Sequence, residues 1–500
     1  MEELPGRIAG LSSAQRAVPE RRLRDKASTL APQRIPRRNP DEPCPLSFAQ
    51  ERLWFLDQWH PGIPVYNVAT HLQLSGPVDL QALEQSANEI IRRHEALRTT
   101  FRLIDGTPVQ VIAPHLSIPV PVVDLEPLTD VDRGPALARH AGDEVRIPFN
   151  LADGPLLRTT LFRLGEYDHV LLLVMHHIVS DGESTDIFFR ELAVLYQAFR
   201  DGAPSPLSEL PIQYGDFASW QRKRLETSLT SHLSYWKRTL ESIPTELGLP
   251  SARPRPPVQS FRGAVHSFSL SRELSDAIQA LSRREGVTLF MTLLAAFKIL
   301  LNRYTAETDL VVGSPIAHRA QTETEGLIGF FVNILVLRSN LSGDPRVLDL
   351  LRRIRTVALG AYAHQDLPFE RLVAELHPQR SLDRNPLFQV MFAFQGSHAL
   401  IPLATTGSPA ASVPLSTGTA KFDLALSVVD TGHGLTCTVE YSTDLFDEAL
   451  MVRLGCQYEV LLAGMTANPA RRLSELPMLT AAENRQILET WNDTSLPDWP

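Results

Sequence analysis

The chain has 500 residues, of which 43% are hydrophobic and 21% are charged, a composition typical of an ordinary globular protein. This length is too great for one hydrophobic core, so we expect two or three domains. The formal net charge of −9 argues against nucleic acid as the main partner. No apolar run approaches the ~18 residues that span a bilayer, and the N-terminus lacks the apolar segment of a signal peptide, so we expect no membrane partner.

The three cysteines, Cys44, Cys437 and Cys456, lie far apart in the sequence. An odd number of cysteines without the spacing of metal ligands is typical of a reducing compartment. We therefore expect a cytoplasmic protein with neutral thiols and no metal site.

Residues 1–40 are rich in arginine and end in closely spaced prolines. The pattern indicates a solvated N-terminal extension, with a short helix at residues 8–23, although a docking element has the same composition. The elements expected next are a helix around Leu53, a strand at 66–74, a helix capped by Asp79, and a hairpin of strands at 155–164 and 168–175.

Closely spaced prolines between Glu209 and Gly263 indicate a turn-rich crossover between two lobes. The elements expected after it are a buried helix at 289–301, strands at 310–312 and 333–337, a hairpin at 424–429 and 435–441, and a helix at 446–462. The pattern predicts an α+β fold of two similar lobes, at residues 41–225 and 226–485, followed by a linker at 486–500.

The run MHHIVSDG at residues 175–182 follows a nearly pure apolar strand and precedes a helical pattern. Two adjacent histidines therefore lie on a short turn, with Asp181 and Gly182 close behind. Histidine exchanges a proton near neutral pH, and loops on a rigid scaffold often carry catalytic groups. A strand-end histidine is also commonly a satisfied polar residue, so the turn alone does not decide the function.

The run H-H-x-x-x-D-G resembles the signature of the condensation domains of nonribosomal peptide synthetases. Six further segments resemble the other motifs of that family, in the same order: SFAQERLWFL at 47–56, RHEALRTTF at 93–101, YGDFASW at 214–220, IGFFVNILVLR at 328–338, HQDLPFE at 364–370 and RNPLFQVMF at 384–392. Related cyclization, epimerization and oxygenase-recruiting domains differ at the histidines or in the later motifs. The resemblance therefore favours a condensation domain.

The resemblance implies two lobes similar to chloramphenicol acetyltransferase, arranged as a V with a central tunnel. It makes His177 the catalytic group, either as a base or as a hydrogen-bonding group, with His176 beside it in a more structural role. Gly182 would let the backbone approach the substrate and donate its amide to the oxyanion. Asp181 would pair with Arg319 as a structural element of the active site.

Ser180 and Asn333 are the expected substrate-binding residues, although Asn333 is equally well explained as an ordinary strand residue. His94 falls on the core-facing side of its predicted helix, so we expect it to be a core histidine. The resemblance implies no bound cofactor. The 4′-phosphopantetheine arm would arrive on a partner carrier protein or within coenzyme A.

The expected reaction is amide-bond formation on an aminoacyl-carrier protein by a monomeric lobe pair. The C-terminus resembles a linker towards a downstream adenylation domain, and the N-terminal position of the domain favours a fatty acyl-CoA donor, as in starter domains of lipopeptide synthesis. Alternatives are a peptidyl or aminoacyl donor on a separate carrier protein, a stand-alone acyl-CoA acyltransferase, and a silent docking scaffold.

Overall fold

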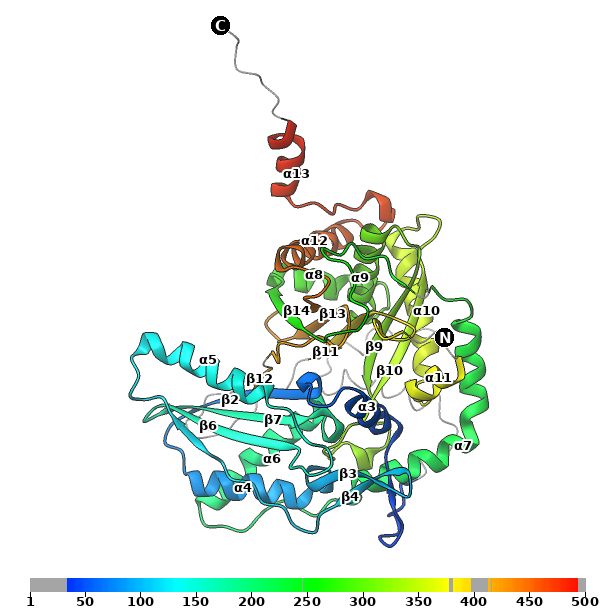
Figure 1. Cartoon of the computed structure of the whole chain (residues 1–500). Helices are drawn as coiled ribbons and strands as arrows, with labels where there is room; N and C mark the ends of the chain where they lie inside the picture. The colour runs from blue at the N-terminus through cyan, green and yellow to red at the C-terminus, as the bar shows by residue number, and fades with distance from the viewer. Residues whose placement is uncertain (1–33, 245, 377–380, 397–411, 415, 493–500) are drawn as a thin grey trace, which may run out of the picture.

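The computed structural model describes residues 34–244, 246–376, 381–396, 412–414 and 416–492. The helix expected at residues 8–23 lies outside these residues. Figure 1 shows two lobes, each built on its own sheet, with the long helix α7 running along one side of both. Each lobe combines a sheet with helices, so the α+β prediction is confirmed.

The first lobe is built on a five-stranded sheet in the order β12-β2-β7-β6-β5, and a small sheet, β1-β4-β3, lies beside it. Its elements are β1 (Cys44–Pro45), α3 (Phe48–Trp59), β2 (Asn67–Ser75), α4 (Leu80–Arg93), β3 (Thr99–Ile104), β4 (Thr107–Ile112), β5 (Val122–Asp124), α5 (Asp130–Arg146), β6 (Leu157–Gly165), β7 (Asp168–His176) and α6 (Gly182–Arg200). The predicted strand at 66–74 and the predicted hairpin are confirmed as β2 and as β6 with β7. Asp79 caps α4 as expected, since its carboxylate accepts the Ala82 amide at 3.0 Å.

Strand β7 is apolar from Val170 to Met175 because both of its faces are covered there. Leu171, Leu173 and Met175 pack in the cluster formed with α4 and α6, whereas Val170 and Leu172 pack in the cluster that includes α5. Figure 1 shows α5 on one side of this sheet and α4 with α6 on the other. A strand that is buried on both faces reads as an apolar run rather than as an alternation.

The second lobe is built on a six-stranded sheet in the order β10-β9-β11-β13-β14-β8. Its elements are β8 (Gly263–Ser269), α8 (Arg272–Arg284), α9 (Leu289–Thr305), β9 (Asp309–Ala317), β10 (Val332–Asn340), α10 (Val347–Ala363), α11 (Phe369–Leu376), β11 (Val390–Gln395), β13 (Leu424–Asp430), β14 (Leu435–Ser442), α12 (Glu448–Ala467) and α13 (Ala481–Leu488). The predicted buried helix, the predicted hairpin and the last predicted helix are confirmed as α9, as β13 with β14, and as α12. Strands β9 and β10 are longer than the sequence indicated.

The stretch expected to be a turn-rich crossover instead contains α7 (Tyr214–Thr239), a helix of 26 residues. The helix was missed because Pro211 precedes it and the closely spaced prolines begin at Pro244, after it has ended; the turn-rich part of the stretch follows the helix. The helix continues through residues 225 and 226, where the lobe boundary was expected. Phe217 packs in a cluster with Ile35 of the expected extension, whereas Trp236 packs in the core of the second lobe.

The second half of the chain also contributes segments to the first lobe. Strand β12 (Ser412–Pro414), from the second half of the chain, pairs antiparallel with β2 of the first lobe. Residues 327–331 contribute Leu327, Ile328, Phe330 and Phe331 to the apolar clusters of the first half. The lobes are therefore interlocked at the end of β7, where the histidines lie.

Two of the three cysteines are buried, and burial raises the pKa of Cys44 to about 11 and that of Cys437 to about 12. Their thiols are therefore neutral, as expected. Among the described residues, no single helix combines the length and the apolar composition of a membrane span; α8 and α9 reach both only as a pair, and that pair is bent by 108°.

Lys298 is fully buried within α9, and its ammonium binds only neutral oxygens. Its Nζ donates to the Leu337 carbonyl at 2.6 Å, to the Ser339 hydroxyl at 2.7 Å and to the Leu310 carbonyl at 3.4 Å. The lysine therefore links α9 to β9 and β10. Burial lowers its pKa to about 7.

Lys298 makes the stability of the fold depend on pH. Between about pH 7 and 10 the unfolded chain binds the lysine proton and the folded chain does not, so stability rises with pH by at most about 1.4 kcal/mol per pH unit. We expect the free energy of unfolding of the wild type to rise relative to Lys298→Met over this range, as measured by urea titration. A difference that is constant with pH would show that the buried lysine does not titrate there.

Candidate active site

The histidine turn is placed by the end of β7 and the start of α6. His176 is the last residue of β7 and pairs across the sheet with Asn67 of β2. A short 3₁₀ turn, His177–Val179, follows, and Asp181 then caps α6. Gln50 of α3 supports the turn from the side, because its Nε2 donates to the Ile178 carbonyl at 3.1 Å.

The ring of His177 is held in one tautomer. Its Nδ1 lies 2.7 Å from the Ser180 carbonyl oxygen, which can only accept, so Nδ1 carries the proton and Nε2 keeps its lone pair. Within the described part of the chain, Nε2 has no hydrogen-bond partner. The ring of Phe330 packs against the imidazole, with its centroid 4.7 Å away. Burial, and to a lesser extent the charge of Lys421, lower the pKa of His177 to about 3, so the ring is neutral at physiological pH.

His176 is buried and serves the turn itself. Its Nδ1 accepts the Ile178 amide at 3.1 Å, which caps the 3₁₀ turn. The rings of Tyr66 and Phe149 lie 6.3 and 6.2 Å from its ring. Burial, then the neighbouring His177, lower the pKa of His176 to about 3. These contacts agree with the structural role expected for the first histidine.

Asp181 is buried and forms the expected ion pair with Arg319 of the second half, with Oδ1 2.9 Å from a guanidinium nitrogen. The same Oδ1 accepts the amide and the hydroxyl of Ser184 at 2.8 and 2.7 Å. The other carboxylate oxygen, Oδ2, accepts the Phe331 amide at 3.1 Å. One carboxylate therefore caps α6 and binds two segments of the second half.

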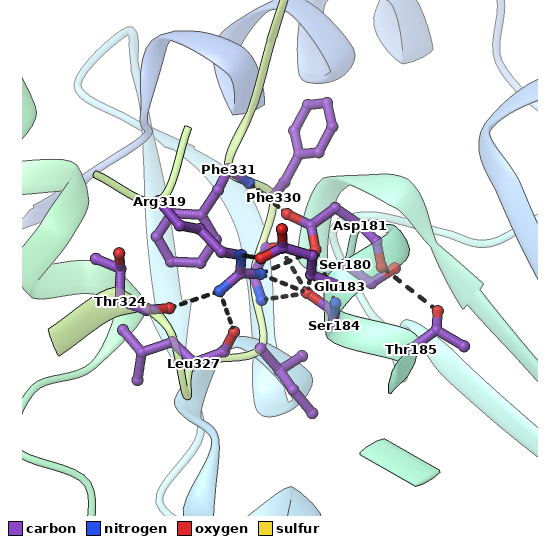
Figure 2. Close-up of polar contacts among 12 residues, drawn as sticks. Ser180, Asp181, Glu183, Ser184, Thr185, Arg319, Thr324, Leu327, Phe330 and Phe331 are labelled. Carbon is purple, nitrogen blue, oxygen red and sulfur yellow. Dashed lines mark hydrogen bonds and ion pairs between the residues drawn. The ribbon is translucent and has the colours of Figure 1, made fainter. Parts of the chain in front are cut away.

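Arg319 fills the space between α6 and residues 324–331, as Figure 2 shows. One terminal nitrogen donates to the carbonyls of Thr324 and Leu327, both at 2.6 Å. The other terminal nitrogen donates to Asp181 and, at 3.1 Å, to Ser184. The guanidinium also lies over the Phe331 ring, 4.0 Å from its centroid, and Nε lies 2.9 Å from Glu183 Oε2. The buried cation is thus almost fully surrounded by acceptors.

Ser184 was not predicted from the sequence, yet it is central to this network. Its hydroxyl contacts Asp181, Arg319 and both backbone groups of Gly329, with the Gly329 carbonyl at 2.9 Å and its amide at 3.0 Å. The only sequence signal for it is a serine three residues after the capping aspartate. Such a position suggests a local cap contact and gives no indication of a partner 145 residues away.

The other predicted residues serve the fold directly. The Ser180 hydroxyl donates to the His176 carbonyl at 3.2 Å, and its own carbonyl orients His177. The Asn333 amide donates to the carbonyls of Gln365 and Leu367, both at 2.8 Å, while its oxygen accepts two backbone amides. All four hydrogen-bonding positions of Asn333 are used within the protein. Substrate binding by Ser180 and Asn333 stays a prediction.

Gly182 is exposed and is the first residue of α6. A Cβ at this position would lie 3.4 Å from Nε2 of Gln395, the last residue of β11. The second lobe therefore reaches the same turn from across the interface. His94, by contrast, is a satisfied core histidine as expected: its Nε2 lies 3.1 Å from Glu191, and its Nδ1 accepts the Ile328 amide at 3.2 Å.

Among the described residues, no group of three or more histidine, cysteine, aspartate or glutamate side chains is arranged to hold a metal ion. The arrangement at the turn is instead a neutral imidazole with a free lone pair, next to the N-terminus of a helix. Such a site can accept a hydrogen bond from an attacking nucleophile and stabilise negative charge.

Comparison with protein families identifies the chain. The sequence model of the condensation domain matches residues 41–488. The chain belongs to the condensation domain family. The condensation domains of nonribosomal peptide synthetases are acyltransferases that form amide bonds, and this chain is an enzyme of that kind.

Relatives of this condensation domain include a component of the linear gramicidin synthase of Brevibacillus parabrevis, 46% identical over 91% of this chain and 6% of that protein. Phosphinothricin tripeptide synthetase PhsC of Streptomyces viridochromogenes is 43% identical over 98% of this chain and 45% of that protein. The chain therefore spans less than half the length of these relatives.

Two solved structures are similar to this condensation domain. The X-domain from teicoplanin biosynthesis has a TM-score of 0.79 and 28% sequence identity over 89% of this chain and all of its own. The first condensation domain of the calcium-dependent antibiotic synthetase has a TM-score of 0.75 over 88% of this chain and all of its own, and at 22% identity it shows the fold.

Removing the Asp181 carboxylate should lower the free energy of unfolding of the condensation domain. We expect Asp181→Ala to cost about 3–5 kcal/mol of unfolding free energy, because it removes the buried anion of Arg319 and leaves only the exposed carboxylate of Glu183 beside it. The matched control is Asp143→Ala, which removes an exposed ion pair with Arg146 and should cost at most about 1 kcal/mol. Equal losses in urea titrations of the two variants would contradict the structural role of the pair.

Gly329 must lack a side chain because Tyr214 packs on it. A Cβ there would lie 2.0 Å from a ring atom of Tyr214, whose hydroxyl donates to the Phe330 carbonyl at 2.6 Å. We expect Gly329→Ala to cost about 1–3 kcal/mol in chemical unfolding. Gly326→Ala, where the added Cβ has no neighbour within 4 Å, is the control and should change stability little. A stable Gly329→Ala would show that this packing is not required.

Proposed function

We propose that this condensation domain transfers an acyl group from a thioester donor to the amine of an aminoacyl thioester on a carrier protein. The observation that carries the proposal is the neutral imidazole of His177, whose free Nε2 is held in place by the Ser180 carbonyl. The phosphopantetheine arm belongs to the substrates, because each thioester is carried on it.

The chemistry needs little activation, because a thioester is already reactive. The amine nitrogen forms a bond to the carbonyl carbon, the C–S bond breaks, and the thiolate takes up the proton that the nitrogen loses. His177 Nε2 accepts a hydrogen bond from the amine. This hydrogen bond orients the lone pair of the amine nitrogen towards the carbonyl carbon. A pKa of about 3 makes this imidazole a weak base. It therefore favours a role in which His177 orients the amine and passes the proton on, rather than one in which it stays protonated.

The Gly182 backbone amide is the second group that we assign to the reaction. It lies in the first turn of α6, where the backbone amides and the helix dipole favour negative charge. The amide and the hydroxyl of Ser184 donate to the Asp181 carboxylate, which fixes this turn. The Gly182 amide therefore does not need to reorganise during the reaction. Gly182 would therefore donate to the oxyanion of the tetrahedral intermediate.

A carrier-bound peptidyl or aminoacyl donor is favoured over acyl-CoA. The named relatives are a linear gramicidin synthase and a tripeptide synthetase, and the fatty acyl-CoA donor expected from the sequence has no support in these names. Acyl-CoA is the second candidate, because coenzyme A presents the same thioester on the same arm. An adenylation domain downstream of residue 488 would load the acceptor.

The reaction is tested by intact-mass spectrometry of an aminoacyl-carrier protein incubated with the domain. The donor is offered in two ways, as an aminoacyl thioester on a second carrier protein and as a medium-chain acyl-CoA. We expect a mass gain of one acyl group with the carrier-bound donor. A gain with acyl-CoA alone would support the second candidate.

His177→Ala should reduce the transfer rate by at least about 100-fold, because the amine loses its acceptor. The control is His433→Ala, which changes an exposed histidine in the turn between β13 and β14 and should leave the rate unchanged. Full activity of His177→Ala, or no transfer by the wild type from either donor, would contradict the proposed function.

A further inference from the structure

Lys421 is a residue of the second half of the chain that reaches the histidine turn of the first lobe. Its ammonium lies over the ring of Tyr66, 5.4 Å from the centroid. The Tyr66 ring is in turn 6.3 Å from the His176 ring, and Tyr66 directly precedes β2, which pairs with His176. A cation from the other lobe is therefore positioned beside the catalytic turn.

The backbone of Lys421 is held by side chains from three separate segments. Its amide donates to Glu440 Oε1 at 3.2 Å, and its carbonyl accepts from Gln259 at 3.3 Å and from Asn385 at 2.8 Å. The neighbouring Phe422 stacks on Phe388, with ring centroids 5.5 Å apart. Three long-range contacts on the backbone of one residue show that the position of this lysine is specified.

The ammonium of Lys421 has no anionic partner among the described residues. Burial lowers the pKa of Lys421 most strongly, the charge of Glu440 raises it, and the charge of Arg52 of α3 lowers it. The Glu440 carboxylate accepts the backbone amide of the lysine rather than its ammonium. A half-buried cation without a direct ion pair among the described residues costs stability.

Lys298 provides a contrast, because it is fully buried whereas Lys421 is half-buried. Lys298 has three oxygen acceptors and links elements of the core. Among the residues that the structure describes, no oxygen acceptor binds the Lys421 ammonium, and its charge lowers the pKa of both His176 and His177. A charge that destabilises the fold and acts at the reaction centre is typical of a functional group.

We propose that Lys421 is a positioning residue for the acyl transfer, which supplies from the second lobe a positive charge that stabilises the negative charge developing on the thioester carbonyl oxygen. The inference rests on the proposed function, since it assigns Lys421 to the same reaction. It acts through the field of a fixed charge over Tyr66, next to the histidine turn, without a bond to the substrate.

Single-turnover acyl transfer, KM for the acceptor carrier protein and the unfolding midpoint test this role together. We expect Lys421→Met to lower the rate at saturating substrates roughly ten-fold, with KM nearly unchanged. Its unfolding midpoint should equal or exceed that of the wild type, because an unpaired charge has been removed. Lys421→Arg keeps the charge and should restore most of the rate. Lys237→Met, which removes an exposed lysine of α7, is the control.

Other outcomes overturn the inference in distinguishable ways. A Lys421→Met variant as fast as the wild type, while His177→Ala is inactive, would remove Lys421 from the reaction and leave the proposed function standing. A slow variant with a lowered unfolding midpoint that Lys421→Arg does not restore would show a purely structural lysine. A wild type that transfers no acyl group would overturn the proposed function and this inference with it.

Discussion

The buried ion pair between Asp181 and Arg319 is the interaction on which the active site depends. Asp181 caps the helix whose first residue is Gly182, and it also binds the Phe331 amide of the second half. Arg319 connects the same carboxylate to the carbonyls of Thr324 and Leu327. The start of α6 and the loop before β10 therefore cannot move independently, and the histidine turn lies directly before them.

Two buried cations and one half-buried cation are used in three different ways in this molecule. Arg319 is surrounded by acceptors, so its charge is compensated. Its hydrogen bonds to both halves of the chain connect the two lobes. Lys298 binds neutral oxygens inside one lobe and gives up part of its basicity. Lys421 is left without an anion from the described residues beside the histidines, where its charge bears on the reaction. The degree of compensation separates the structural cations from the one assigned to the chemistry.

Much of the first lobe could be predicted from local patterns. Asp79 as a helix cap and the apolar strand before the histidines are short-range signals, and the structure has both. Helix α7 was missed because the prolines that follow it dominated the composition of the whole stretch. The pairing of Asp181 with Arg319 was expected from the family resemblance, since neither residue carries a local signal for the other.

The contacts that complete the site are long-range and leave no pattern in the sequence. Ser184 meets Gly329 across 145 residues, and Gln50 reaches the histidine turn from α3, 128 residues before it. Lys421 is placed by side chains from three other segments. Asn333 is the opposite case: it is an asparagine in a strand near the interface, but its amide is fully occupied in holding residues 365–369.

The central claim is that the interlocked lobes hold His177 as a neutral imidazole with Nε2 free. The most direct test is the nitrogen-15 NMR spectrum of histidine-labelled protein at about pH 6.5, near the ordinary pKa of histidine, with the His177 signals assigned by their loss in His177→Ala. The account predicts a neutral ring protonated on Nδ1, with no titration down to about pH 5, because the pKa of this ring is about 3. A protonated ring near neutral pH, or a proton on Nε2, would contradict it.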